Sequence, residues 1–172
     1  MSGLIGLGDH QAKMRVYMGN RPAFVFADAH QQVSALQQGE IAAVGQACGN
    51  GWRKVFNVYA KLVFALGNEL SLAQRCREYD NWQAYRDQRL LQADSNTALI
   101  FSAYQSTPPE HNIIHLVMGR TYASSLQLPV SLQWLDKEFA CDLEHQLIVC
   151  PYFDYRQLSN SKIIHLVDLL SQ

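Results

Sequence analysis

Apolar residues form a nearly continuous run from residue 113 to residue 118, which only His115 interrupts and which Gly119 follows. Short apolar runs of this kind are typical of central strands in parallel sheets, which are buried on both faces. Thr121 then opens a segment rich in small residues, which predicts a helix ending near Leu126. Since α/β domains place ligands at the carboxyl ends of their strands, we expect a site at this turn.

Two further strands end in unusual turns. The alternating segment from Lys13 to Met18 predicts a strand that leads into Gly19-Asn20-Arg21-Pro22. The run Leu147-Ile148-Val149-Cys150 predicts a second short buried strand, followed by Pro151-Tyr152-Phe153-Asp154. Because the carboxyl ends of parallel strands meet at one edge of a sheet, we predict that the turns near residues 20, 120 and 152 are neighbours.

Helical periodicity is clearest between Trp52 and Leu66, where apolar residues recur at a spacing of three and four and Gly67 provides the end signal. Asp28 and Gln31 resemble a capping box, which predicts a polar helix to about Gln46, weakened or broken at Gly39. Two more helices are predicted: Ser71 to about Leu91, and a final helix that Ser159 or Asn160 caps.

One segment admits two structures. The composition of Thr97–Tyr104 favours a strand, whereas Asp94-Ser95-Asn96 in front of it offers helix caps. Only about ten residues separate it from the strand at Asn112, too few for a parallel crossover. We predict a helix here, with an antiparallel edge strand as the alternative. The pattern from Leu128 to His145 predicts no particular element.

Composition indicates a single globular domain over residues 1–172, with 48% hydrophobic and 17% charged residues. The formal net charge of −1 gives no general attraction to nucleic acid or to acidic membranes. Residues 1–91 nevertheless carry ten Lys and Arg against seven Asp and Glu, so a local basic face is one interpretation and ordinary solvated surface is the other.

The four cysteines are far apart and form no paired ligand motif, so we expect reduced thiols, no metal site and no cofactor. No apolar run is long enough for a membrane helix, and the amino terminus lacks a signal-peptide pattern. We therefore expect a cytoplasmic protein that has no membrane partner. A hydrolase acting through a nucleophile finds little support, because no Gly-x-Ser-x-Gly motif occurs.

The order of the three turns resembles the uracil-DNA glycosylase superfamily. In that superfamily a first strand ends in a Gly-x-(Asp/Asn)-Pro type turn, and a middle strand ends in Leu-Gly, followed by Lys/Arg-Thr and a small-residue helix. A late strand ends in a His-Pro-Ser or Asn-Pro-Ser loop before the last helix. The resemblance covers Asn112 to Leu170 well and residues 14–22 thinly. It implies an α/β three-layer sandwich with a short, mostly parallel central sheet flanked by helices.

The resemblance also implies a function: binding a base or nucleotide in DNA and cleaving its N-glycosidic bond, which requires a flipped-out base in a snug pocket. Asn20 would orient water, and Tyr152 would donate a hydrogen bond to the base. Gly19, Gly119, Thr121 and Pro151 would shape the pocket, Arg21 and Arg120 would hold phosphate, and Phe24 and Phe153 would stack on bases.

This chain lacks two groups that catalytic members of the superfamily use. The late turn departs from the pattern, because it has no His beside Pro151 and Tyr152 follows it; the first turn has Asn20, as some members do, and so lacks a carboxylate. Both departures favour the alternative function, a catalytically inactive α/β protein that recognises a nucleotide, a nucleic acid or a protein partner. Each of these residues also has a purely structural interpretation, and we interpret His115 as a hydrogen-bonded core residue rather than a ligand.

Overall fold

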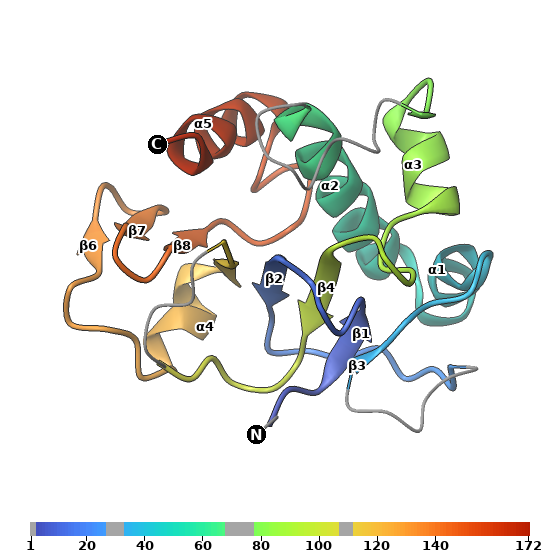
Figure 1. The fold of residues 1–172 in the computed structure, drawn as a ribbon, viewed down its shortest axis with the longest axis horizontal. Helices are drawn as coiled ribbons and strands as arrows, with labels where there is room; N and C mark the ends of the chain where they lie inside the picture. The colour runs from blue at the N-terminus through green and yellow to red at the C-terminus, as the bar shows by residue number, and fades with distance from the viewer. Residues whose placement is uncertain (1–2, 27–32, 68–77, 107–111) are drawn as a thin grey trace.

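A computed structural model of the protein describes residues 3–26, 33–67, 78–106 and 112–172 (Figure 1). Within them, eight strands form one mixed sheet in the order β3-β1-β4-β2-β5-β8-β7-β6. They are β1 (Gly6–Gly8), β2 (Met14–Tyr17), β3 (Val33–Ser34), β4 (Thr97–Ile100), β5 (Ile114–Met118), β6 (Gln133–Trp134), β7 (Ala140–Asp142) and β8 (Leu147–Cys150). The four central strands, β4, β2, β5 and β8, are parallel to one another, whereas β1–β4, β7–β8 and β6–β7 pair antiparallel.

Helices cover the two faces of this sheet unequally. The five helices of the described residues are α1 (Glu40–Cys48), α2 (Asn50–Leu66), α3 (Trp82–Gln88), α4 (Arg120–Ser124) and α5 (Asn160–Leu170). On one face α2 packs against α1, α3 and α5, while the other face carries the short α4 and the connecting segments around it (Figure 1). The predicted α/β class, with a mostly parallel sheet flanked by helices, is confirmed.

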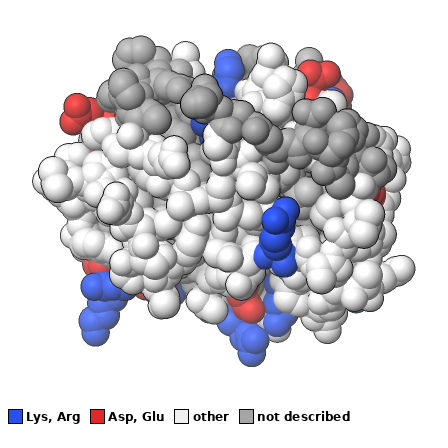
Figure 2. All heavy atoms as spheres, turned by 90° about the horizontal axis from the view of Figure 1, so that it is seen from below, with Lys and Arg blue, Asp and Glu red and all other residues white. Residues whose placement is uncertain are grey.

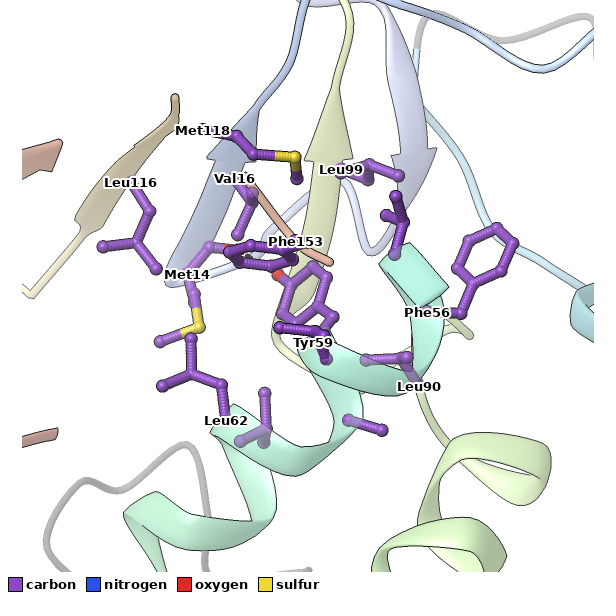
Figure 3. Packing of buried hydrophobic residues seen from close by; sticks show 14 of the residues in the cluster. Met14, Val16, Phe56, Tyr59, Leu62, Leu90, Leu99, Leu116, Met118 and Phe153 are labelled. Carbon is purple, nitrogen blue, oxygen red and sulfur yellow. Dashed lines mark hydrogen bonds between the residues drawn. The ribbon is translucent and has the colours of Figure 1, made fainter. Parts of the chain in front are cut away.

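Side chains point alternately to the two faces of the central strands, so a hydrophobic core forms on each face of the sheet. In β2, Met14 and Val16 point toward α2, where they meet Tyr59 and Phe153 (Figure 3), and Tyr17 points to the opposite face. The fully buried Tyr59 hydroxyl donates a hydrogen bond of 2.9 Å to the Ala98 carbonyl and so ties α2 to the sheet. Strands with apolar residues on both faces need cover on both sides, as the sequence pattern predicted.

The predicted helix between Trp52 and Leu66 is confirmed as α2, which Gly67 follows with a left-handed φ of 55°. The final helix is confirmed as α5, for which Ser159 is the N-cap residue. No helix in these described residues is both long and apolar enough to cross a membrane.

The helix prediction for Thr97–Tyr104 is wrong, and so is the alternative of an edge strand. Residues Thr97–Ile100 form β4, which is buried throughout and lies inside the sheet between β1 and β2. Asp94 and Asn96 do not cap a helix, because both adopt left-handed backbone angles and form a turn into the strand. The crossover argument failed because β4 neighbours β2 rather than β5.

Two other helices are shorter than predicted. Instead of one helix to Gln46, the chain forms β3 and then α1, which begins at Glu40 because Gly39 has a left-handed φ of 93°. The capping pair Asp28 and Gln31 lies outside the described residues. Of the helix predicted from residue 71 to 91, residues 71–77 also lie outside them, and α3 begins only after Asn81, whose side chain caps it.

Candidate functional site

Three turns lie together at one edge of the sheet. Strands β2, β5 and β8 are adjacent and parallel, and the register pairs Tyr17 with Val117 and Met118 with Cys150. The Gly119 amide then donates a hydrogen bond of 2.8 Å to the Cys150 carbonyl, so the second and third turns start side by side. The strand pairing therefore places the turns near residues 20, 120 and 152 at the same edge, as expected.

These turns line one cavity of about 640 Å³, which we call the edge cavity. A volume of this order matches the roughly 300–1,000 Å³ of small-molecule sites. Predicted site residues in its lining are Gly19, Asn20, Gly119, Arg120, Thr121, Pro151 and Tyr152. Further lining residues are Met118, Tyr122, Ser125, Lys137, Glu138 and Gln157.

Two glycines shape this edge. Gly119 has a left-handed φ of 95°, which lets the chain leave β5 and enter α4 at once. At Gly19 a β-carbon would lie 3.1 Å from the ring of Tyr122, so the first turn and α4 approach each other closely. Both glycines therefore bring the β2 and β5 turns together.

Arg120 is already engaged within the protein. Its guanidinium lies 4.5 Å from the ring centroid of Trp134, and Nη1 donates a hydrogen bond of 2.9 Å to the Lys137 carbonyl. A cation–π contact contributes about 0.5–1 kcal/mol at an exposed site, and a hydrogen bond from a charged donor contributes up to about 3 kcal/mol. An exposed ion pair contributes only about 0–1 kcal/mol. Two contacts to the chain therefore hold the Arg120 guanidinium, and a phosphate would have to compete with both of them.

The segment between β6 and β7 contributes Lys137 and Glu138 to the lining of the edge cavity. The Asp136 carboxylate accepts hydrogen bonds of 2.7 Å from the amides of Glu138 and Phe139, which lower its pKa. Glu138 pairs with Lys162 of α5 at 2.7 Å. Lys137 is exposed and lines the edge cavity, and among the described residues its ammonium has neither a hydrogen bond nor an ion pair.

The late turn separates two adjacent aromatic residues. Tyr152 is half-buried and lines the edge cavity. Phe153 is fully buried and meets Tyr59 edge to face, with ring centroids 5.8 Å apart (Figure 3). Of the two, only Tyr152 is placed to meet a ligand; Phe153 belongs to the core.

Two other predicted site residues lie away from the edge cavity. The Arg21 guanidinium lies 5.6 Å from the ring centroid of Phe101. Phe24 packs on Phe26, with ring centroids 4.9 Å apart, and against the larger core. The first turn thus contributes Gly19 and Asn20 to the cavity, and no cation.

Lys137, Glu138 and Gln157 were not predicted from the sequence. The first two follow Asp136 between short apolar segments, and a charged cluster between such segments is a hairpin signal. This signal would have placed the charges in a turn, but it would not have shown which edge of the sheet they reach.

A second polar cluster lies where β7 turns back toward β8. Asp142, Glu144 and His145 bring ligand atoms within 4.8 Å of one another. The Asp142 carboxylate already accepts hydrogen bonds from Ser131 Oγ at 2.5 Å and from the His145 amide, and it lies 2.9 Å from His145 Nδ1. These hydrogen bonds stabilise the turn between β7 and β8, and we therefore assign the cluster a structural role.

The surroundings of His115 agree with its interpretation as a hydrogen-bonded core residue. It is half-buried, its Nδ1 is hydrogen-bonded to the Tyr17 hydroxyl at 2.8 Å, and the Tyr104 ring meets it edge to face. Burial, with Arg15 and His145 nearby, lowers its pKa to about 4.

A family of unknown function, DUF6942, matches residues 5–171 of the sequence. The chain belongs to this family. No curated protein and no solved structure matched the chain. Membership in DUF6942 assigns no activity, so the function must be argued from the edge cavity.

Proposed function

We propose that this DUF6942 protein binds a base or nucleotide of nucleic acid in the edge cavity, as a divergent relative of uracil-DNA glycosylases. The observation that carries the proposal is the convergence of three strand ends on one cavity that contains aromatic, amide and cationic side chains. A nucleotide combines a flat base, hydrogen-bonding edges and an anionic phosphate, and it needs this combination of partners.

The base would lie against Tyr152. This ring is half-buried at the cavity, while the neighbouring Pro151 and Phe153 are buried and fix the turn that carries it. Asn20 and Gln157 supply amides that can both donate to and accept from the edge of a base. Stacking on one aromatic side chain contributes about 1–3 kcal/mol per base.

The phosphate would lie on the β6–β7 side, where Arg120 and Lys137 both line the cavity. The formal net charge of −1 is more compatible with a small cationic site than with a broad basic face. Figure 2 shows the face seen from below in Figure 1, and uncharged residues cover most of what is described there, with few Lys and Arg side chains. The described part of that face therefore offers no broad basic surface to an extended duplex.

Cleavage of the N-glycosidic bond is the second proposal, and Asn20 supports it because its amide lines the cavity and would orient a water molecule. Binding without cleavage is the competing function. It is supported by the side chains that line the cavity among the described residues: the only carboxylate is Glu138, which is paired with Lys162, and there is no histidine.

Binding and cleavage can be separated in one experiment. We would titrate the protein against a labelled single-stranded oligonucleotide of about ten nucleotides, compete with a nucleoside monophosphate, and test damaged-base oligonucleotides for abasic sites. Tyr152→Ala should weaken binding about tenfold, as the loss of one stacked base requires. Tyr155→Ala, an exposed tyrosine three positions away that does not line the cavity, is the matched control.

Asn20→Ala should abolish any cleavage, and it should weaken binding without abolishing it, because it removes one of the two amides at the edge of the base. If wild-type protein binds neither the oligonucleotide nor the monophosphate, the nucleotide proposal is wrong and a protein partner becomes the better hypothesis. Binding with no abasic sites on any substrate would leave the inactive binding function.

A further inference from the structure

We propose that Arg120 is a positioning residue and that Lys137 is the cation that meets the ligand's phosphate in the edge cavity. This inference rests on the proposed function. It reverses the expectation from the sequence, in which Arg120 at the start of a helix holds phosphate and Lys137 has no role.

The contacts of Arg120 point inward to the protein. Its guanidinium stacks on Trp134, the last residue of β6, and Nη1 bonds to the carbonyl of Lys137 at 2.9 Å. Arg120 itself follows β5, so this pair of contacts ties the β5 turn to the segment that joins β6 to β7. The guanidinium thereby holds the backbone of Lys137 against the edge cavity.

Three further contacts fix the same segment. Asp136 accepts two amide hydrogen bonds at the turn, and Glu138 is held by Lys162 of α5 at 2.7 Å. The residues on both sides of Lys137 are thus anchored, and the Glu138 charge is balanced by its partner. Lys137 itself is exposed and lines the cavity, and its ammonium has no partner among the described residues.

This arrangement assigns distinct tasks to two neighbouring cations. An ammonium on a flexible stem can follow a phosphate oxygen as a point charge, whereas a planar guanidinium is suited to simultaneous stacking and hydrogen bonding. The segment Trp134–Glu138 is then the wall that fixes where a phosphate can lie, and Arg120 acts on the ligand only through that wall.

The salt dependence of oligonucleotide binding distinguishes the two tasks, because each ionic contact to a single strand contributes about 0.7 to the slope of log K against log salt. With the oligonucleotide of the binding experiment, Lys137→Gln should lower affinity and reduce the slope by about 0.7. Arg120→Gln should lower affinity at every salt concentration and leave the slope unchanged. Lys13→Gln, the same charge change just before β2 at the opposite edge, is the control and should change neither.

Conservative variants and a double-mutant cycle complete the test. Arg120→Lys should behave like Arg120→Gln, since an ammonium cannot both stack on Trp134 and bond to the Lys137 carbonyl in the same way. Trp134→Ala should lower affinity as Arg120→Gln does, and the double variant should lose little more than either one. Circular dichroism melting of each variant checks that the fold is kept.

A slope reduced in Arg120→Gln and restored in Arg120→Lys would show a direct phosphate contact and overturn the inference while leaving nucleotide binding intact. An unchanged slope in Lys137→Gln would overturn it as well. If wild-type protein fails to bind the oligonucleotide at any salt concentration, the proposed function is wrong and the inference is lost with it.

Discussion

The core beneath α2 and the edge cavity meet at two neighbouring residues of one turn, which are buried to different extents. Phe153 lies fully buried against Tyr59 in the core, whereas Tyr152 beside it is only partly buried against that core and also lines the cavity. In the core, apolar side chains alternate along each strand and are placed by burial alone. At the edge, residues far apart in the chain meet only because β2, β5 and β8 are adjacent and parallel. Stability and the candidate function therefore depend mainly on different residues within one turn.

The largest difference is expected when each aromatic residue of the turn is truncated in a separate variant. Phe153→Ala should lower the free energy of unfolding by about 3–5 kcal/mol, because it leaves a cavity between β2 and α2. Tyr152→Ala should lower it by only about 1–2 kcal/mol, since the ring is only partly buried against the core. Urea unfolding of both variants measures the difference, and equal losses would show that the turn is not divided in this way.

Acid should weaken the opposite face of the sheet through His115. Burial lowers the folded-state pKa of this imidazole from 6.5 to about 4, so the unfolded chain binds the proton first as pH falls. The stabilising contribution is complete above pH 6.5 and is lost as pH falls toward 4. It is on the order of 2 kcal/mol, because each pKa unit corresponds to about 1.4 kcal/mol and part of the ring meets solvent.

Chemical denaturation at a series of pH values measures this effect. His115→Gln should flatten the profile between pH 6.5 and 4, while His10→Gln, at an exposed histidine, should keep the wild-type slope. Parallel profiles for wild type and His115→Gln would contradict a buried neutral imidazole.

A smaller effect concerns the hydrogen bond that joins α2 to the sheet. Tyr59→Phe should cost about 1–2 kcal/mol, because the Ala98 carbonyl loses a donor inside the core. Tyr155→Phe removes a hydroxyl from an exposed ring and should cost almost nothing. The unfolding free energies of the two variants give the comparison, and a neutral Tyr59→Phe would mean that water or another donor replaces the lost bond.

The elements predicted correctly from the sequence are those that have a clear local pattern of apolar residues. The strands β2, β5 and β8 and the helices α2 and α5 follow from apolar runs, helical spacing and glycine end signals. β4 was missed because Asp94 and Asn96 have the composition of helix caps, and only their left-handed backbone shows that they form a turn. Tertiary pairing with β1 and β2 then decided the structure of Thr97–Ile100.

The candidate site was predicted only in part, because some of its residues follow clearly predicted strands and others do not. Asn20, Arg120 and Tyr152 stand directly after strands, so the order of the sheet was enough to bring them together. Lys137 reaches the same cavity through a hairpin of two-residue and three-residue strands, which carry almost no periodic signal. Phe153 points inward because it contacts Tyr59, and the spacing of residues within the turn does not predict this contact.

The most direct test of nucleotide binding at the edge cavity is a map of backbone amide resonances during titration with a nucleoside monophosphate. We predict saturable shifts at Gly19, Asn20, Gly119, Lys137 and Tyr152, with unchanged resonances for Lys13 and Gln146 at the opposite edge. Shifts confined to that opposite edge, or no shifts at all at millimolar ligand, would contradict the account.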